Sequence, residues 1–446
     1  MNSRRRQEQG ISPSSGCASP SSSALSPHRR WWFRLLALTL PLVLLLGVSD
    51  AALRLARYGY ATDFFRPSLV RSQKVLIEND RFALRFFPPR LARTPEPFVM
   101  PVRKPAGTFR IFVLGESAAL GDPEPAYGAG RYLQVLLGER YPTEKFEVVN
   151  VAMTAINSHA ILPIARECSR HHGDLWIVYM GNNEMVGPFG AATVFGAQTP
   201  PLAVIRLNLA LQTTRVGQLL TALGRKLRPN SATPSSWGGM EMFLRNKLPP
   251  ASPRKKTAYH HFQQNLREIL KAGLNSGAKV VVSTVAVNLK DCPPFASAAD
   301  PDLPQGRRET FEQLCADGNR AEEQCLWTQA VGRYEQAAAL DPHFAELQFH
   351  WGACLLHLAH TNWASEHLQL ACDNDALPFR ADSAINDVIR QEGRRVAGGN
   401  LVLCDAASAL ADESPAGICG QESFFEHVHL CFDGNYRLAR AWAFQV

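Results

Sequence analysis

The segment TFRIFVLGES, residues 108–117, decides the fold. Residues 108–114 are rich in apolar and aromatic side chains, which predicts a buried strand, and the Gly and Ser that follow predict a turn. Further strands are predicted at 146–151, 175–179, 278–287 and 400–405, and helices at 130–140, 159–170, 259–272 and from about 433 to the end. Strands that alternate with helices build a mostly parallel sheet. The sequence therefore predicts an α/β fold.

Polar motifs follow four of these elements. Gly115-Glu116-Ser117 ends the first strand, and residues 150–158 (NVAMTAINS) follow the second. The third strand is followed by 181–184 (GNNE), and 426–429 (EHVH) come after the last strand. The carboxyl ends of parallel strands meet at one edge of the sheet, where active sites of such folds lie. We therefore expect these motifs to form one site.

The four motifs, in this order, resemble the SGNH/GDSL hydrolase family. The resemblance covers roughly residues 108–195, 255–292 and 395–446 and implies a three-layer, flavodoxin-like sheet with helices on both faces. It further implies that Ser117 is the catalytic nucleophile, that His429 is its general base and that Glu426 is the third member of the triad. Ser117, Ala155 and Asn183 would then supply the oxyanion hole.

The chain departs from the family pattern at four positions. Glu replaces Asp at 116, 184 and 426, and Ala155 stands where the family has Gly. Glu426 matters most, because its extra methylene changes how the carboxylate reaches the imidazole. Ala155 keeps its N–H and can serve as a donor provided that its φ is negative. The residue types present are those that ester cleavage needs: a hydroxyl, a base, a carboxylate that orients the base, and donors for the oxyanion.

His427 and His429 offer an alternative, because two histidines that alternate along an extended segment can bind zinc. A zinc site needs three or four ligands, and no third ligand is patterned nearby. No CxxC pair occurs among the ten cysteines, of which nine lie beyond residue 160. The sequence therefore predicts no metal and no cofactor.

Composition and charge exclude other classes of protein. With 46% hydrophobic and 20% charged residues, the 446-residue chain has ample material for a core and is not a disordered chain. The net charge is +7, but residues 1–34 carry six Arg and one Glu and so account for +5 of it. The remainder is too weakly basic for a phosphate-binding surface, so no nucleic-acid partner is predicted.

The N-terminal region predicts a membrane anchor. A Leu-rich, uncharged stretch at 35–49, extended to 31–53, reaches the length of a spanning helix. Five arginines precede it and two follow closely, which predicts a cytoplasmic N-terminus and a catalytic domain outside the cytoplasm, periplasmic or at the cell surface. A cleaved signal peptide is the alternative, because small residues surround 49–51.

Two insertions interrupt the predicted catalytic domain. Residues 311–376 look like two tetratricopeptide repeats, because small and aromatic residues recur 34 positions apart at Gly318 and Gly352, Ala330 and Ala364, Tyr334 and Leu368, and Ala337 and Ala371. Such repeats shape access to a site or bind a protein partner. Residues 196–258 contain one or two amphipathic helices within 202–227, which form either a lid or a surface against the membrane.

The predicted organisation is a disordered cytoplasmic tail (1–30), a signal anchor (31–53), an irregular stalk or wrapping segment (54–107), the first part of the hydrolase domain (108–300), a helical insertion (301–395) and the C-terminal part of the hydrolase domain (396–446). The predicted function is a membrane-anchored serine esterase or deacetylase that acts on an envelope carbohydrate or lipid. An O-acyltransferase with the same residues and a non-catalytic tetratricopeptide scaffold on a degenerate hydrolase fold are the alternatives.

Overall fold

The computed structural model describes residues 27–227, 236–395 and 399–446, which form two compact units divided after Tyr58. The first unit contains helix α1 (Pro27–Leu55), which includes the predicted span at 31–53. Its part from Trp31 to Leu55 is apolar and long enough to cross a membrane, as an anchor or as a signal sequence. The predicted tail lies outside the described residues except for 27–30, which begin this helix.

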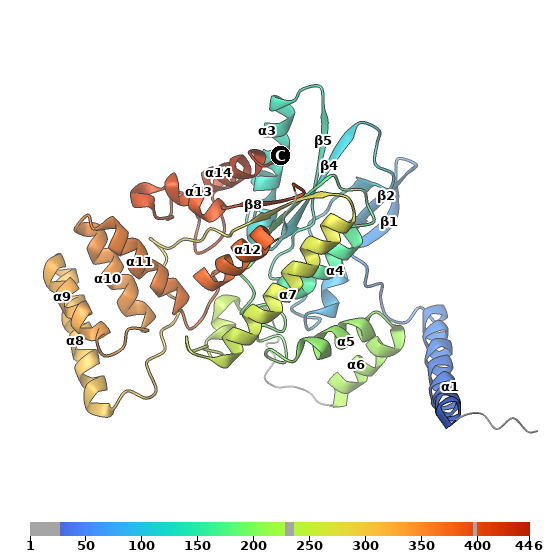
Figure 1. The fold of residues 1–446 in the computed structure, drawn as a ribbon, viewed down its shortest axis with the longest axis horizontal. Helices are drawn as coiled ribbons and strands as arrows, with labels where there is room; N and C mark the ends of the chain where they lie inside the picture. Colours follow the sequence, from blue (N-terminus) through green and yellow to red (C-terminus); the bar gives the residue numbers. More distant parts are fainter. Residues whose placement is uncertain (1–26, 228–235, 396–398) are drawn as a thin grey trace, which may run out of the picture. The chain divides into compact units, whose positions relative to one another are not determined.

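The second unit is built around a parallel sheet of five strands (Figure 1). They are β4 (Thr108–Gly115), β5 (Lys145–Asn150), β6 (Leu175–Tyr179), β7 (Lys279–Ser283) and β8 (Leu401–Cys404). Their spatial order is β5-β4-β6-β7-β8, and every neighbouring pair is parallel. This is the 2-1-3-4-5 order of flavodoxin-like folds, so the predicted fold class is confirmed.

Strand β7 is shorter than the predicted segment 278–287. The last backbone bond to β8 is made by the Thr284 N–H, which donates to the Cys404 carbonyl oxygen over 3.0 Å. Beyond it, a side chain replaces the strand partner, since the Val285 N–H donates to Asn386 Oδ1 over 2.8 Å. Residues 285–291 are thereby freed from the sheet and turn toward the site described below.

Helices cover both faces of the sheet (Figure 1). One face carries α3 (Ala129–Arg140), α13 (Ala406–Asp412) and α14 (Phe432–Ala443), and the other carries α4 (Ser158–Cys168), α7 (Pro253–Asn275) and α12 (Ser383–Arg395). Trp176 of β6 and Trp442 of α14 are wholly buried in the core between these layers. The Trp442 indole N–H donates to Ser283 Oγ over 3.2 Å, so this buried polar group has a partner.

The segment predicted as an irregular stalk or wrapping segment is more regular than predicted. Residues 65–101 contain an antiparallel sheet of β1 (Phe65–Val70), β2 (Gln73–Glu78) and β3 (Met100–Pro101), with a short 3₁₀ helix, η1 (Phe82–Arg85). Phe64 and Phe82 are wholly buried in the main core. The segment therefore wraps the catalytic unit, because its aromatic side chains supply part of the core although proline obscures any regular pattern.

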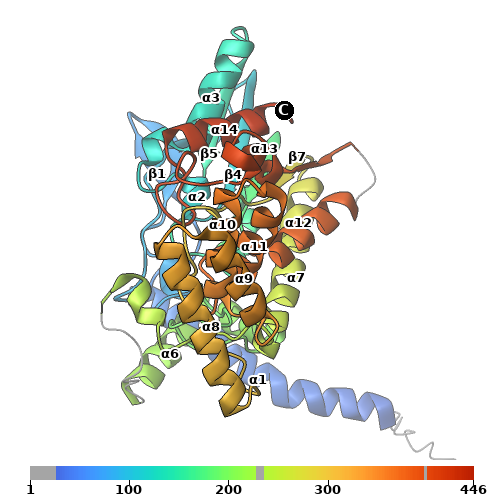
Figure 2. The same ribbon diagram turned by 90° about the vertical axis from the view of Figure 1, so that its left-hand side faces the viewer.

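Between β7 and β8 the chain forms two helical hairpins, as predicted (Figure 2). They are α8 (Gln305–Glu323) with α9 (Trp327–Ala338) and α10 (Ala345–His357) with α11 (Thr361–Asp373). A Cβ at Gly318 would lie 2.4 Å from the Tyr334 ring, and one at Gly352 would lie 2.8 Å from Leu368. The same close contact thus recurs after 34 residues, and the assignment to tetratricopeptide repeats stays a prediction.

The other insertion contains α5 (Leu202–Gln212), α6 (Arg215–Leu227) and the 3₁₀ helix η3 (Gly239–Phe243). The two helices correspond to the amphipathic segment predicted at 202–227. Three short helices complete the described chain: α2 (Ser117–Leu120), η2 (Pro125–Tyr127) and η4 (Pro415–Gly417). The nine described cysteines are all free, and Cys17 lies outside the described residues.

Candidate active site

Ser117 lies at the carboxyl end of β4, where it begins the short helix α2. This position is beside the point at which the strand order reverses, because β4 has β5 on one side and β6 on the other. A Cβ at Gly115 would lie 2.1 Å from the Tyr179 carbonyl oxygen, so only Gly lets the two strand ends approach this closely. The turn therefore presents Ser117 at the edge of the sheet.

His429 reaches the same edge from a loop near the C-terminus. The loop is closed on itself, since the Phe425 N–H donates to the His429 carbonyl oxygen over 2.8 Å. It is also tied to the loop that follows β7: Asn288 Nδ2 donates to the Glu426 carbonyl oxygen over 3.0 Å, and the Asn288 N–H donates to the His427 carbonyl oxygen over 2.9 Å. Two distant parts of the chain therefore fix the position of the imidazole.

The Glu426 carboxylate contacts two imidazole rings. Its Oε1 lies against Nδ1 of His429, and its Oε2 lies against Nδ1 of His427. The Glu426 carboxylate also accepts the His429 N–H over 3.0 Å. The longer side chain of Glu426, identified above as the main departure from the family pattern, does reach the imidazole. The second contact, to His427, was not predicted.

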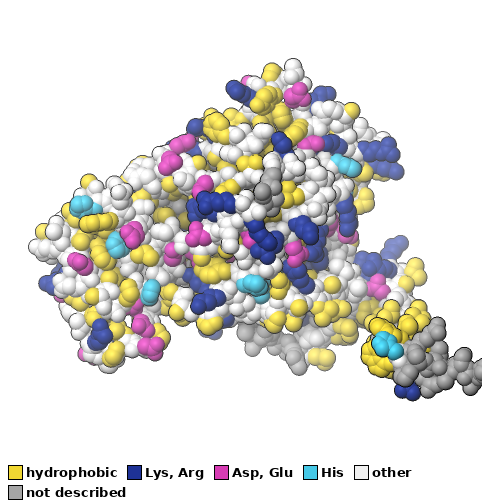
Figure 3. Space-filling view, in the orientation of Figure 1, with side chains coloured by type: hydrophobic (Ala, Val, Ile, Leu, Met, Phe, Trp, Pro, Cys, Tyr) yellow, Lys and Arg dark blue, Asp and Glu magenta, His cyan; other side chains and the backbone are white. Residues whose placement is uncertain are grey.

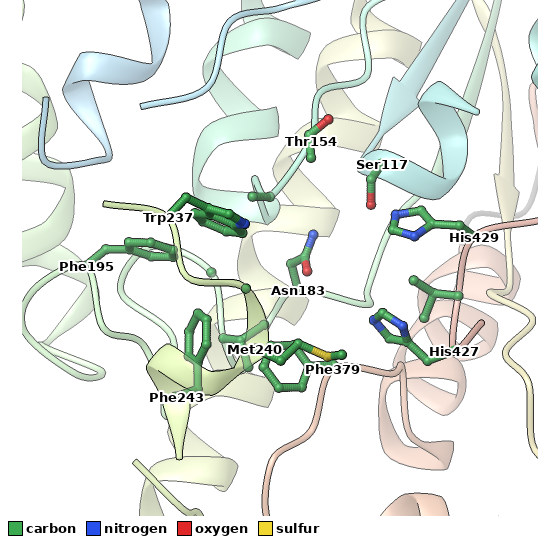
Figure 4. A pocket seen from close by; sticks show the side chains of 15 residues that line it. Ser117, Thr154, Asn183, Phe195, Trp237, Met240, Phe243, Phe379, His427 and His429 are labelled. Carbon is green, nitrogen blue, oxygen red and sulfur yellow. The ribbon is translucent and has the colours of Figure 1, made fainter. Parts of the chain in front are cut away.

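The opposite nitrogen of His429 is free to act. Its Nε2 is buried and has no hydrogen-bond partner among the described residues. In Figure 4 the Ser117 hydroxyl and the His429 ring lie next to one another at the edge of a cavity that both line. Burial lowers the pKa of His429, with an opposing contribution from Asp122, so the imidazole is neutral and able to accept a proton at neutral pH.

His427 projects into the lower part of the same cavity (Figure 4). Its ring makes edge contacts with Phe295 and Phe379, at centroid distances of 5.2 and 6.2 Å. Burial, His429 and Arg380 lower the pKa of His427 to about 3, so this ring is neutral. Among the described residues, no three His, Cys, Asp or Glu side chains are grouped as ligands for a metal ion.

Ala155 departs from expectation in its backbone. Its φ is +63°, in the left-handed region, and not negative as the sequence analysis expected. The backbone conformation is thus one that suits the Gly of the family, and Ala adopts it at a cost on the order of 1 kcal/mol. Within the described residues, the N–H groups of Ser117 and Ala155 have no hydrogen-bond acceptor. Both remain available to a ligand in the cavity.

Asn183 lines the cavity between Ser117 and the ring of Trp237 (Figure 4). Its Nδ2 donates to the Ile156 carbonyl oxygen over 3.1 Å, which orients the amide and leaves the second N–H of Nδ2 unused. Its backbone N–H donates to Glu116 Oε2 over 3.1 Å. The strand-end motifs at 115–117, 155 and 181–184 therefore do meet at one site.

Two buried glutamates support this arrangement from behind. Burial raises the pKa of Glu116 well above its usual value, and the neighbouring Glu184 adds to the effect. Burial raises the pKa of Glu184 to about 7, although its carboxylate accepts both the N–H and the hydroxyl of Ser158, over 2.7 and 2.9 Å. The two Asp-to-Glu departures at 116 and 184 thus place structural carboxyls beneath the site, outside the cavity lining.

The cavity has a volume of about 240 Å³ and two different walls. Its polar wall carries the residues Ser117, Thr154, Asn183, His427 and His429. Its apolar wall is formed by Val186, Phe195, Trp237, Met240, Phe243 and Phe379. Phe195 and Trp237 stack at 6.2 Å, and Phe243 meets Phe379 edge-on at 5.1 Å. Figure 4 shows Phe195, Trp237 and Phe243 on the far side of Asn183 from His429.

The sequence analysis did not identify the apolar wall. Half of its six residues, Trp237, Met240 and Phe243, come from the insertion at 196–258. Val186 and Phe195 precede the insertion, and Phe379 comes from the segment that follows the helical hairpins. That segment also contacts the site motifs, since the Ala381 N–H donates to Asn182 Oδ1 over 3.0 Å. No periodic pattern marks these residues, so no signal in the sequence could have found them.

No family model and no curated protein matches this chain. Several solved structures resemble it. TesA matches at 15% identity with a TM-score of 0.22, over 40% of this chain and 62% of its own. An alpha/beta hydrolase from the metagenome of Lake Arreo, Spain, matches at 8% identity with a TM-score of 0.34, over 76% and 94%. A member of the lipolytic protein G-D-S-L family from Veillonella parvula matches at 9% identity with a TM-score of 0.32, over 75% and 95%.

Proposed function

We propose that the protein is an SGNH/GDSL-type serine hydrolase that cleaves ester bonds. One observation carries the proposal: Ser117 and the unpartnered Nε2 of His429 line one cavity, while Glu426 contacts the other nitrogen of the same ring. A nucleophile, a base and a group that orients the base are the three parts that acyl transfer requires.

The reaction follows from this geometry. His429 Nε2 takes the proton of Ser117 Oγ as that oxygen attacks the ester carbonyl carbon. The N–H groups of Ser117 and Ala155 and the Asn183 amide donate to the oxyanion. His429 then returns the proton to the leaving alcohol oxygen, and the acyl group stays on Ser117. Water, deprotonated by His429, attacks this acyl-enzyme and releases the acid.

The two walls of the cavity contact different parts of the substrate. The leaving oxygen must face His429, because it receives the proton from that ring. The acyl group then extends past Asn183 toward the apolar wall, which supports an acyl group larger than acetyl. An acyl ester of an envelope lipid or carbohydrate fits this division, and acetyl esters use the apolar wall least.

The same proposal includes the location. Helix α1 serves as a signal anchor, with the N-terminus in the cytoplasm and the catalytic unit outside it. The length and apolar composition of Trp31–Leu55 support a spanning helix, and the excess of arginine before it supports the orientation. A protein partner at α8–α11 remains a separate expectation from the repeat pattern.

A fluorophosphonate probe, combined with hydrolysis of p-nitrophenyl esters, tests the proposal. The wild-type chain should be labelled and should turn over a hexanoate ester. Ser117→Ala should abolish both, whereas Thr154→Ser, a conservative change on the polar wall, should keep both. If the wild-type chain is neither labelled nor active, the proposed hydrolase function is wrong and the non-catalytic scaffold is favoured. Labelling without hydrolysis, with transfer to an added sugar, would identify an acyltransferase.

A further inference from the structure

The second unit exposes an unusual apolar face on the hairpin of α5 and α6. Side chains that point away from the core are mostly leucine: Leu207, Leu211, Leu220 and Leu223 are 61, 52, 62 and 46% exposed, respectively. The inward face is made by Ile205, Leu209 and Gln218, which are buried. Figure 3 shows hydrophobic side chains gathered along the lower edge of the molecule, where Figure 1 places α5 and α6. The surfaces of soluble proteins seldom expose such a row of apolar side chains, which indicates an interaction surface.

The charge of this hairpin points to an anionic partner. Residues 202–227 contain three arginines and one lysine and no acidic residue. Arg206 pairs with Glu268 of the catalytic unit, but Arg225 and Lys226 are exposed at the end of α6 beside the outward leucines. An apolar face flanked by Lys and Arg is typical of helices that lie in the interface of a lipid bilayer.

The covalent chain brings α6 close to the end of the membrane-spanning candidate. Gln218 of α6 holds Tyr60 by two hydrogen bonds, each 3.0 Å long: the Tyr60 N–H donates to Gln218 Oε1, and Gln218 Nε2 donates to the Tyr60 carbonyl oxygen. Helix α1 ends at Leu55, and the chain from Leu55 to Tyr60 spans at most about 18 Å. This limit holds at any angle between α1 and the second unit.

We propose that the outward face of α5 and α6 rests on the lipid bilayer from which α1 emerges. The headgroup layer is only about 5–8 Å thick on each side, so a tether of this length keeps α6 within reach of it. The outward leucines enter the acyl boundary, and Arg225 and Lys226 contact lipid phosphates.

The contact has a consequence for the substrate, which rests on the proposed function. The hairpin lies between Phe195 and Trp237 in the chain, and these two residues stack on each other in the apolar wall. The start of α5 at Leu202 lies only seven positions after Phe195, so a hairpin on the membrane keeps the Phe195 side of the apolar wall within about 25 Å of lipid. The substrate class is then an ester of a membrane lipid, whose acyl chain reaches the cavity without crossing water.

Vesicle binding by residues 59–446 tests the surface without depending on catalysis. This part is expected to fold alone, because every residue of the buried core lies at 64 or beyond. The wild-type fragment should sediment with phosphatidylcholine vesicles that contain phosphatidylglycerol. The variant Leu220→Glu/Leu223→Glu should bind at least about tenfold more weakly, and Arg225→Gln/Lys226→Gln should lose the preference for phosphatidylglycerol.

A matched variant controls for added charge. Val135→Glu/Trp363→Glu adds two carboxylates at sites that are each 61% exposed on α3 and α11, and it should bind vesicles like wild type. Thermal unfolding checks that each variant is folded. Equal binding by Leu220→Glu/Leu223→Glu and wild type would overturn the proposal, as would a wild-type fragment that ignores vesicles and dimerises through this face. If the fragment binds vesicles but is not labelled by the fluorophosphonate probe, the membrane-binding surface stands and the proposed lipid substrate is wrong.

Discussion

The two walls of the cavity differ in how they are held. The polar wall consists of side chains at strand ends and in one hydrogen-bonded loop, where Asn288 ties the backbone at 426–427 to the loop that follows β7. The apolar wall consists of mostly aromatic side chains from the insertion at 196–258 and from two other segments, and contacts between rings hold it together. The proposed function assigns the chemistry to the first wall and substrate choice to the second, so substitutions in them should produce separable kinetic effects.

The largest effect is expected for Glu426→Gln in the polar wall. The variant keeps the shape of the side chain but removes the charge that fixes the His429 tautomer, so kcat should fall by about 10³–10⁴ with little change in KM. Steady-state kinetics with a soluble p-nitrophenyl ester measure this change. Glu426→Asp, which alters only the reach, should retain part of the activity. Wild-type turnover by Glu426→Gln would reduce the site to a Ser/His dyad.

Loss of one oxyanion donor should come next. Asn183→Ala removes the amide that faces the cavity, and kcat should fall by about 10²–10³. The backbone N–H of residue 183 still donates to Glu116, so the turn should persist. Comparison of kcat with the melting temperature separates the two roles. A fall in stability without a fall in kcat would show that Asn183 only supports the turn.

A smaller and selective effect is expected in the apolar wall. Phe243→Ala enlarges the acyl side of the cavity and removes contacts with the acyl chain. For a hexanoate ester kcat/KM should fall about tenfold, whereas for an acetate ester it should change by less than about twofold. A series of p-nitrophenyl esters of increasing length measures both. Equal losses for acetate and hexanoate would place the acyl group elsewhere in the cavity.

The smallest effect concerns pH. The base must be neutral to accept a proton, and burial lowers the pKa of His429 below its ordinary value of 6.5. Activity is therefore lost only as the pH falls through this lowered pKa. Between pH 8 and 6.5, kcat/KM should decline by less than about twofold, as measured in buffers of constant ionic strength. A midpoint above pH 7 would mean that Glu426 outweighs burial in setting the pKa.

The sequence by itself determined the repeating parts of the fold. The strand at 108–114, its four parallel partners and the helices between them follow from apolar patterns that each element carries locally, and the structure confirms them. The 34-residue recurrence likewise predicted a repeated helical unit, and in the structure the contact of Gly318 with Tyr334 recurs as that of Gly352 with Leu368. The candidate site could be predicted from strand ends, because a parallel sheet must bring its carboxyl ends together.

Only the tertiary structure decided the features that depend on residues far apart in the chain. The loop that carries Glu426 and His429 is held by Asn288, which lies 138 positions earlier in the chain, and Ala155 adopts a positive φ that its own side chain disfavours. The wrapping strands at 65–101 and the apolar wall also lack a periodic pattern. Such features arise from packing between segments, because a contact across the fold leaves no period in the sequence of either partner.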